Sequence, residues 1–272
     1  MIINKNYKLI LIIQETEKSI IYIAENNSDK NLHHKTVVIK SFTKSEDYLF
    51  ALNKDYSFPI PIEMIFLKLI EDENLSPKAL DYIQNDTEFA IVMENLNGNW
   101  MDLCEFIETK TSEITVRKII TNIIKGLEKL ISKGVYHLDV KLENIMINRV
   151  TYDIKFIDFE SSLYEIIEEN PKHCGCVGTV GYSSYEALSG EAYDVKKNMV
   201  FEIGCLIYIF NEKRFLFNTR KDYEDITSIP YYNCSKNLKN LIDKCLAYNS
   251  EERLNLNDFF SHDWFRKTSF KQ

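Results

Sequence analysis

The sequence predicts an α+β fold in two lobes, a small β-rich lobe with one helix followed by a larger, mainly helical lobe. Short β-branched runs dominate the first hundred residues, and apolar residues at helical spacing dominate the rest of the chain. The change between the two patterns falls in the polar segment 94–98. We therefore expect a single domain over residues 1–272, with the first lobe at 1–94, a hinge at 94–98 and the second lobe at 99–272.

The first lobe is expected to contain four strands and one helix. Runs of apolar and β-branched residues predict the strands, which cover residues 8–13, 19–24, 36–39 and 89–93. The polar turn between the first two strands lacks Gly and Asn, which is unusual for a hairpin. A helix is expected from Pro61, because proline fits the first turn and Phe66 and Ile70 follow at helical spacing.

The second lobe is expected to be built around long helices. Apolar residues at i, i+3 and i+4 predict a helix over 116–131, which Gly134 ends. The other expected elements are strands at 145–148 and 154–157, a helix at 199–210 that is buried on every side, and an amphipathic helix at 238–246.

The composition excludes several classes of function. Apolar residues make up 45% of the chain and charged residues 27%, as in an ordinary soluble globular protein. Asp and Glu (41) outnumber Lys and Arg (33), and the net charge of -8 argues against a nucleic acid or an anionic membrane as a partner. The chain has 8 glycines and the first is Gly98, which excludes a dinucleotide-binding glycine turn or a P-loop in the first third.

The cysteines and the apolar segments indicate an intracellular protein. The 6 cysteines form no C-x-x-C pair, and Cys205 and Cys245 lie in apolar runs, so we expect reduced core thiols. The segment HCGC (173–176) lacks the second pair that a zinc site would need. The apolar run 9–13 is too short for a secretory signal, and charges such as Glu202 break the longer apolar stretches. We expect a monomer in the cytoplasm or the nucleus.

The strongest functional pattern is HLDVKLEN (137–144), which is followed by IDFE (157–160). It resembles the catalytic loop and the metal-binding turn of eukaryotic protein kinases, whose patterns are HRDxKxxN and DFG. Phosphoryl transfer needs a carboxylate beside the attacking hydroxyl, and a second carboxylate and an amide oxygen that hold Mg²⁺ against the phosphates. The alternative is a capped loop and a strand-terminal Asp without a catalytic role, which four polar matches in fixed register disfavour.

The resemblance implies a bilobal protein-kinase-like fold that uses ATP and Mg²⁺, and it gives each polar residue of the motif a role. Asp139 would be the catalytic base and Lys141 would steady the transferring phosphate. Asn144 and Asp158 would bind the metal.

Other segments match the same family in the same order. VVIK (37–40) resembles the strand whose lysine contacts the α- and β-phosphates, and Glu63 is the expected ion-pair partner of Lys40. The resemblance also implies a gatekeeper residue and a hinge that accepts adenine through backbone groups. The expected ATP-binding residues are Lys40, Glu63, Met93, Glu94, Leu96 and Asp102. GTVGYSSYE (178–186) resembles the end of an activation segment, where Glu186 would form a structural ion pair with Arg253.

Finer likenesses point to serine/threonine kinases of the PIM-like group. Lys141 is typical of serine/threonine kinases, and PIEMIFLK (61–68) resembles a PIM-like helix. These kinases hold basic residues upstream of the target Ser or Thr with acidic side chains, and Glu143, Glu105 and Asp102 match such positions. The alternative is a solvated acidic face on a chain of net charge -8. Met199 stands where the family has an Asp that braces the catalytic loop, which PIM-like kinases also lack.

The phosphate-binding loop departs from the family pattern. Gln14, Thr16 and Ser19 occupy the positions of the three loop glycines, although glycine lets a backbone approach phosphate without a Cβ in the way. Glu15 and Glu17 add negative charge to the same loop. Both changes are expected to weaken ATP binding.

Two further departures leave two hypotheses open. Glu160 replaces the glycine of the metal turn, where it either repels the phosphates, or holds a metal or pairs with Lys40. Leu138 replaces the arginine that binds an activation-segment phosphate. The chain is either an atypical serine/threonine protein kinase or a pseudokinase that acts as a protein-binding scaffold or decoy.

Overall fold

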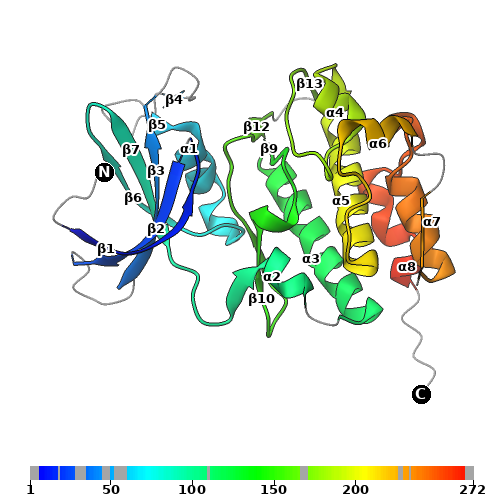
Figure 1. Cartoon of the computed structure of the whole chain (residues 1–272), viewed down its shortest axis with the longest axis horizontal. Coiled ribbons are helices and arrows are strands. Elements are labelled where there is room, and N and C mark those ends of the chain that lie inside the picture. Colours follow the sequence, from blue (N-terminus) through cyan, green and yellow to red (C-terminus); the bar gives the residue numbers. More distant parts are fainter. Residues whose placement is uncertain are drawn as a thin grey trace. The chain divides into compact units, whose positions relative to one another are not determined.

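Tertiary contacts divide the chain into two units, and Figure 1 labels their elements where there is room. The first unit contains residues 1–100 and 155–160, and the second contains 101–154 and 161–272. Residues 155–160, which we expected in the second lobe, thus belong to the first unit. This computed structural model describes residues 6–17, 19–27, 35–44, 50–51, 60–108, 111–165, 171–225, 229–232 and 234–266.

The first unit contains a five-stranded antiparallel sheet in the order β1-β2-β3-β7-β6. Its strands are β1 (Tyr7–Glu15), β2 (Ser19–Asn26), β3 (Thr36–Thr43), β7 (Glu88–Glu94) and β6 (Ala79–Gln84). The four predicted strands are confirmed, and β6 is an addition. Its sequence ALDYIQ shows no clear alternation of apolar and polar residues. The carboxylate of Asp81 accepts a hydrogen bond from the Tyr7 hydroxyl at 3.0 Å. Buried apolar residues such as Tyr22, Ile39 and Val92 form the core of this sheet.

The hairpin between β1 and β2 closes without glycine. The Thr16 amide donates to the Ser19 carbonyl (2.9 Å), and the Thr16 Oγ1 accepts from the Ser19 amide (3.0 Å). None of the described residues of the turn has a positive φ, and Lys18 lies outside the described residues. Because glycine is needed mainly where φ is positive or a Cβ would collide, this turn tolerates the substitutions. Glu15 and Glu17 are exposed, so water solvates their charges.

Helix α1 (Ile62–Leu69) follows Pro61, as predicted, with φ -55° and ψ 139° at the proline. Glu63, Met64, Phe66 and Leu67 are its buried residues. The short strands β4 (Phe50–Ala51) and β5 (Ile60–Pro61) pair antiparallel, and the 3₁₀ helix η1 (Glu71–Glu73) follows α1. The helix therefore places an acidic side chain in the interior of the first unit.

Long helices dominate the second unit. Helix α5 (Val195–Glu212) is buried on every side in its central part, and it packs against α3 (Glu113–Ser132) and α7 (Lys236–Cys245). The predicted helices are therefore confirmed, and Gly134 follows α3 with φ +76°. The shorter helices are α2 (Leu103–Ile107), α4 (Tyr185–Ser189), α6 (Arg220–Asp225) and α8 (Asp263–Arg266).

Short elements complete the chain. The strands are β8 (Trp100–Asp102), β9 (Val135–Tyr136), β10 (Ile145–Asn148), β11 (Ile154–Phe156), β12 (Leu163–Tyr164), β13 (Lys172–His173) and β14 (Tyr193–Asp194). The 3₁₀ helices are η2 (Leu142–Asn144), η3 (Ser250–Glu252) and η4 (Leu256–Ser261). Strand β9 pairs with β12, and β13 pairs with β14. No helix in the described part of the chain has the length and apolar character to cross a membrane.

Candidate active site

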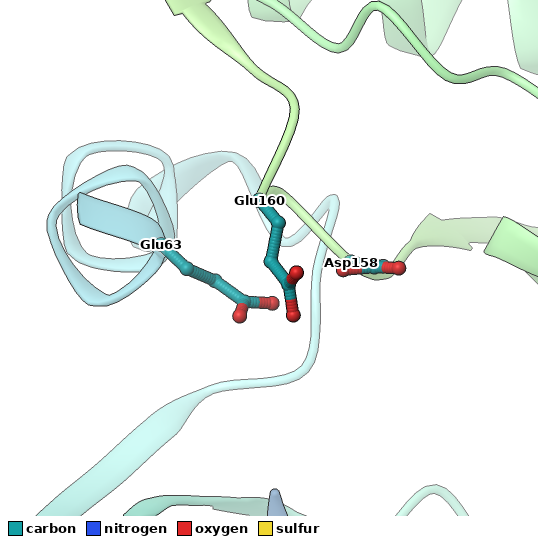
Figure 2. Close-up of side chains that lie close together, drawn as sticks. All are labelled: Glu63, Asp158 and Glu160. Atoms are coloured by element: carbon teal, nitrogen blue, oxygen red, sulfur yellow. The ribbon is translucent and has the colours of Figure 1, made fainter. Parts of the chain in front are cut away.

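The first unit brings Lys40 together with three carboxylates. Lys40 lies on β3 and is 5% exposed, and its Nζ is 3.0 Å from an oxygen of Glu63 on α1. The same Nζ lies 2.8 Å from Asp158 and 2.5 Å from Glu160. Figure 2 shows the Glu63 and Glu160 carboxylates side by side, with Asp158 on the segment that follows β11. The expected pair between Lys40 and Glu63 is thus present.

Hydrogen bonds attach this acidic turn to α1 and to the segment that follows α1. The Phe159 amide donates to the second oxygen of Glu63 at 3.3 Å, and the Phe159 side chain is fully buried. Just before the turn, Lys155 donates to Asn74 (2.7 Å) and to the Ser76 carbonyl (2.9 Å). Asp158 has φ +65°, in the left-handed region that Asp tolerates better than most residues. Glu63 therefore links the helix, the lysine and the turn.

Burial and charge act against each other in this cluster. Burial lowers the pKa of Lys40, but the charges of Glu63, Asp158 and Glu160 outweigh it and the net pKa is raised. Burial raises the pKa of Glu63, and the charges of Asp158 and Glu160 raise it further, while Lys40 opposes the change. One ammonium therefore compensates the carboxylates only in part.

The structure shows which residue the carboxylate of Glu160 contacts. Its carboxylate pairs with Lys40, as one of the two sequence interpretations required. Ligand oxygens of Glu63, Asp158 and Glu160 lie within 4.8 Å of one another. Carboxylate oxygens are the ligands that Mg²⁺ prefers, but the Nζ of Lys40 lies within 3.0 Å of an oxygen of each carboxylate and supplies the positive charge among them. Of the two expected metal ligands, this cluster contains Asp158, whereas Asn144 belongs to the second unit. The three carboxylates therefore share the ammonium of Lys40, the residue that the resemblance assigns to the phosphates of ATP.

The second unit contains a hydrogen-bonded set around Asp139. Lys141 donates to one oxygen of Asp139 (2.7 Å), and the Thr179 hydroxyl donates to the other oxygen (2.7 Å). Asn144 donates to the Asp139 carboxylate (3.1 Å) and carbonyl (3.0 Å), while Lys141 also donates to Thr179 (2.9 Å). Asp139 is 9% exposed. Its carboxylate is therefore held in one orientation by charged and neutral donors.

Leu138 lies inside the core of the second unit. It is 1% exposed and has φ +62°, a conformation that costs a non-glycine residue about 1 kcal/mol or more. An apolar side chain in this place cannot bind a phosphate. Loss of control by an activation-segment phosphate through this position stays a prediction.

The residues expected at the hinge lie in the first unit. Met93, Glu94 and Leu96 are each partly exposed. The Glu94 amide donates to the Lys78 carbonyl (2.9 Å), and the Glu94 carboxylate accepts from the Lys78 amide (3.2 Å). These contacts join the last residue of β7 to the residue that precedes β6. The role of Met93, Glu94 and Leu96 in binding adenine stays a prediction.

The acidic residues expected to bind substrate surround the start of α2. Asp102 is the N-cap of this helix and accepts from the amide of Glu105 at 2.6 Å. Glu105 and Glu143 are exposed. Burial raises the pKa of Cys104 to about 12, and nearby Glu143, Asp102 and Glu108 contribute. Glu143, Asp102 and Glu108 therefore all act on Cys104, and the sequence patterns did not single out Glu108.

Arg253 and Glu186 form the expected ion pair. The guanidinium contacts both carboxylate oxygens, at 2.5 and 3.1 Å, and Arg253 is 3% exposed. Arg253 also donates to the carbonyls of Ala247 (2.8 Å) and Tyr248 (3.1 Å). The pair thus ties the start of α4 to the segment after α7.

Two residues of the site carried no assigned role in the sequence. Thr179 links Asp139 to Lys141, and its place in GTVGY was the signal available. Glu202 is fully buried on α5, where it looked like a charge that interrupts an apolar run. Local sequence patterns reveal neither the hydrogen bonds of Thr179 nor the burial of Glu202.

Two features define the protein-kinase class of fold. The first is a buried Lys–Glu pair at a five-stranded antiparallel sheet, and the second is an ordered Asp–Lys–Asn loop in a helical unit. The family model described as "Protein kinase domain" matches residues 14–265, and the chain belongs to this family. The resemblance seen in the sequence and the predicted fold class are both confirmed.

Known proteins that resemble the chain are named as serine/threonine kinases. The chain is 30% identical to serine/threonine-protein kinase pim-2 of Danio rerio over 67% of the chain and 58% of that protein. It is 30% identical to SAPK1 of Oryza sativa over 69% of the chain and 58% of that protein. CBL-interacting serine/threonine-protein kinase 17 of Arabidopsis thaliana is 28% identical, over 77% of the chain and 50% of that protein. The chain thus spans about half the length of the CBL-interacting protein kinases that it matches.

Proposed function

We propose that the chain is a serine/threonine protein kinase that transfers the γ-phosphate of ATP to Ser or Thr hydroxyls of proteins. The observation that carries the proposal is the ordered set of Asp139, Lys141, Asn144 and Thr179. It joins a base, a cation and an amide in the arrangement that phosphoryl transfer requires. The serine/threonine assignment is supported by Lys141 and by the names of the relatives.

In this proposal each residue of the site has a separate role in phosphate transfer. The substrate hydroxyl oxygen forms a bond to the γ-phosphorus, the bond from phosphorus to the ADP oxygen breaks, and Asp139 takes the hydroxyl proton. Lys141 neutralises charge on the transferring phosphate, and Lys40 contacts the phosphates that remain on ADP. Asn144 and Asp158 would hold Mg²⁺, which supplies positive charge at the phosphates. The proposal requires Lys40 to exchange Glu160 for phosphate oxygens.

A pseudokinase is the second candidate, and one observation favours it. Lys40 is held by Glu63, Asp158 and Glu160 at 2.5 to 3.0 Å. A nucleotide must compete with Glu160 for this ammonium. If it cannot, the fold serves as a protein-binding scaffold or decoy.

Replacing Asp139 with asparagine tests the proposed function. Asp139→Asn keeps the shape of the side chain but removes the base, so we expect kcat/KM to fall at least about 100-fold, or roughly 2.7 kcal/mol of transition-state stabilisation. Transfer of labelled phosphate from ATP to a protein substrate is measured on purified wild type and variant.

Thermal denaturation with ATP and Mg²⁺, or with ATP and a chelator, is the control. Metal-dependent stabilisation of both proteins shows that the variant still binds nucleotide. Equal phosphate transfer by wild type and Asp139→Asn, or no transfer and no shift with the wild type, would contradict the proposed kinase. The second outcome supports the pseudokinase.

We also propose that the kinase favours basic residues upstream of the target Ser or Thr. Glu143, Glu105 and Asp102 are the acidic residues that support this, because carboxylates attract cationic peptides and bind arginine through two hydrogen bonds. A positional peptide library is expected to show enrichment of Arg or Lys upstream, reduced at one position in Glu143→Ala. Enrichment of acidic or proline-directed peptides would reject the proposal, and so would an unchanged basic preference in Glu143→Ala.

A further inference from the structure

A continuous path of hydrogen bonds leads from the core helix α5 to Asp139. The Ser183 hydroxyl donates to Oε1 of Glu202 (3.3 Å), and the Ser183 Oγ accepts from the Thr179 amide (3.1 Å). The Thr179 hydroxyl donates to Asp139 at 2.7 Å. Each member of the path therefore restricts the next, from a helix in the core to the carboxylate of the expected base.

Glu202 is an unusual residue for a helix core. Its exposure is 0%, and besides Ser183 it accepts from Asn198 at 3.0 Å. Its Oε2 makes no hydrogen bond of normal geometry to a described residue. Burial raises its pKa well above the ordinary range, as does the charge of Asp139, while the backbone amide of Val140 opposes the change. A buried carboxyl group costs stability, so its presence needs a reason.

Ser183 is confined as closely as Glu202. It is fully buried, and a Cβ placed on Gly178 (φ +102°) would lie 2.0 Å from its Oγ. A residue other than glycine at position 178 would collide with the Ser183 hydroxyl, which lies between Glu202 and Thr179. Met199, one turn earlier on α5, is fully buried and offers no hydrogen-bond acceptor of the carboxylate kind.

We propose that Glu202 is a positioning residue for Asp139, acting through Ser183 and Thr179. This inference rests on the proposed kinase function only because it takes Asp139 as the catalytic base. The hydrogen bonds that order the Asp139 carboxylate are a property of the fold. Glu202 supplies the brace that Met199 cannot supply. Small displacements of a catalytic group cost large factors in rate, which gives such a brace its value.

Amide hydrogen exchange and steady-state kinetics on four variants test this inference. Ser183→Ala and Glu202→Met interrupt the path, whereas Glu202→Gln keeps an acceptor oxygen and resembles the neutral acid. Cys205→Ala is the matched control, since Cys205 is 1% exposed on the same helix and takes no part in the path.

The variants that interrupt the path are expected to loosen the site locally. Peptides over 137–144 and 177–183 should exchange at least about fivefold faster in Ser183→Ala and Glu202→Met, while α3 peptides stay unchanged. In the same variants kcat should fall about tenfold, with the KM for ATP within about twofold of wild type. Glu202→Gln and Cys205→Ala should retain both the slow exchange and most of kcat.

Three results would overturn the inference. They are unchanged exchange in Ser183→Ala, equal loosening in Cys205→Ala, and a loss in Glu202→Gln as large as that in Glu202→Met. If Glu202→Met does not fold, Ser183→Ala decides, because it removes a single hydroxyl. Absence of phosphate transfer by the wild type would reject the proposed function, while the exchange comparison would still decide the role of Glu202.

Discussion

Replacing Lys40 with methionine is expected to lower the free energy of unfolding by about 3 kcal/mol and kcat/KM by at least about 100-fold. The variant removes the cation from a buried cluster of Glu63, Asp158 and Glu160. Glu63, which is 1% exposed, would lose its compensating charge. Asp158 and Glu160 have side chains that are 40% and 31% exposed, and they can turn towards water. Urea denaturation with an unchanged m-value measures the loss.

The double variant Lys40→Met/Glu63→Met separates stability from catalysis. Replacing both partners of a buried pair with apolar residues of similar volume is often close to neutral, so we expect about half or more of the lost stability to return. Phosphate transfer should not return, because the cation that we propose contacts the phosphates is still absent. Recovery of phosphate transfer in the double variant would contradict the role of Lys40.

The loss in Lys40→Met should also grow with pH. Without Lys40, the pKa of Glu63 rises further above its ordinary value, because the charge that opposes burial is gone. Above a pH of about 7, to which the pKa of Glu63 is raised in the wild type, the folded wild type and the unfolded chains have released this proton, while the folded variant retains it. The folded state then binds more protons, and its stability falls with increasing pH. A loss that is the same at pH 6 and pH 8 would argue against this account.

Replacing Arg253 with leucine is expected to cost about 3 kcal/mol of unfolding free energy, at the lower end for breaking a buried ion pair. The guanidinium, 3% exposed, bonds Glu186 at 2.5 and 3.1 Å and two backbone carbonyls. Removing it leaves all these acceptors without their donor. The side chain of Glu186 is 20% exposed, so water offsets part of the cost.

Glu186→Gln is the matched variant for this prediction. It keeps an acceptor for Arg253 and the carbonyl bonds of Arg253, so its loss should be about half of that in Arg253→Leu. Arg253→Lys should resemble Arg253→Leu more than wild type, because an ammonium cannot reproduce the two-pronged contact. If Arg253→Leu unfolds within about 0.5 kcal/mol of wild type, the ion pair is not a structural element.

Much of the secondary structure could be predicted from local patterns. Runs of β-branched residues mark β1, β2, β3 and β7, and apolar spacing marks α3, α5 and α7. Strand β6 was missed because half-buried positions such as Asp81 and Tyr82 interrupt its pattern. The helix α2 was missed because five residues are too few to show a period.

The candidate site could be predicted only where residues are recognised by type and order. Lys40 and Glu63 were matched in this way, and the structure places them 3.0 Å apart. The missing glycines of the turn between β1 and β2 are expected to weaken ATP binding, and this stays a prediction. The structure adds that the Thr16 hydroxyl accepts a hydrogen bond within the turn and that the described part of the turn has no positive φ.

The sequence by itself determined the two-lobe α+β fold and the order of the kinase motifs, because side-chain periodicity and residue type are local properties. Only the tertiary structure decided that Glu160 shares Lys40 with Glu63, and that Glu202 reaches Asp139 through Ser183 and Thr179. The physical reason is that burial and hydrogen bonding depend on distances in space. Lys40 and Asp158 are 118 residues apart in the chain, yet their side chains lie at 2.8 Å.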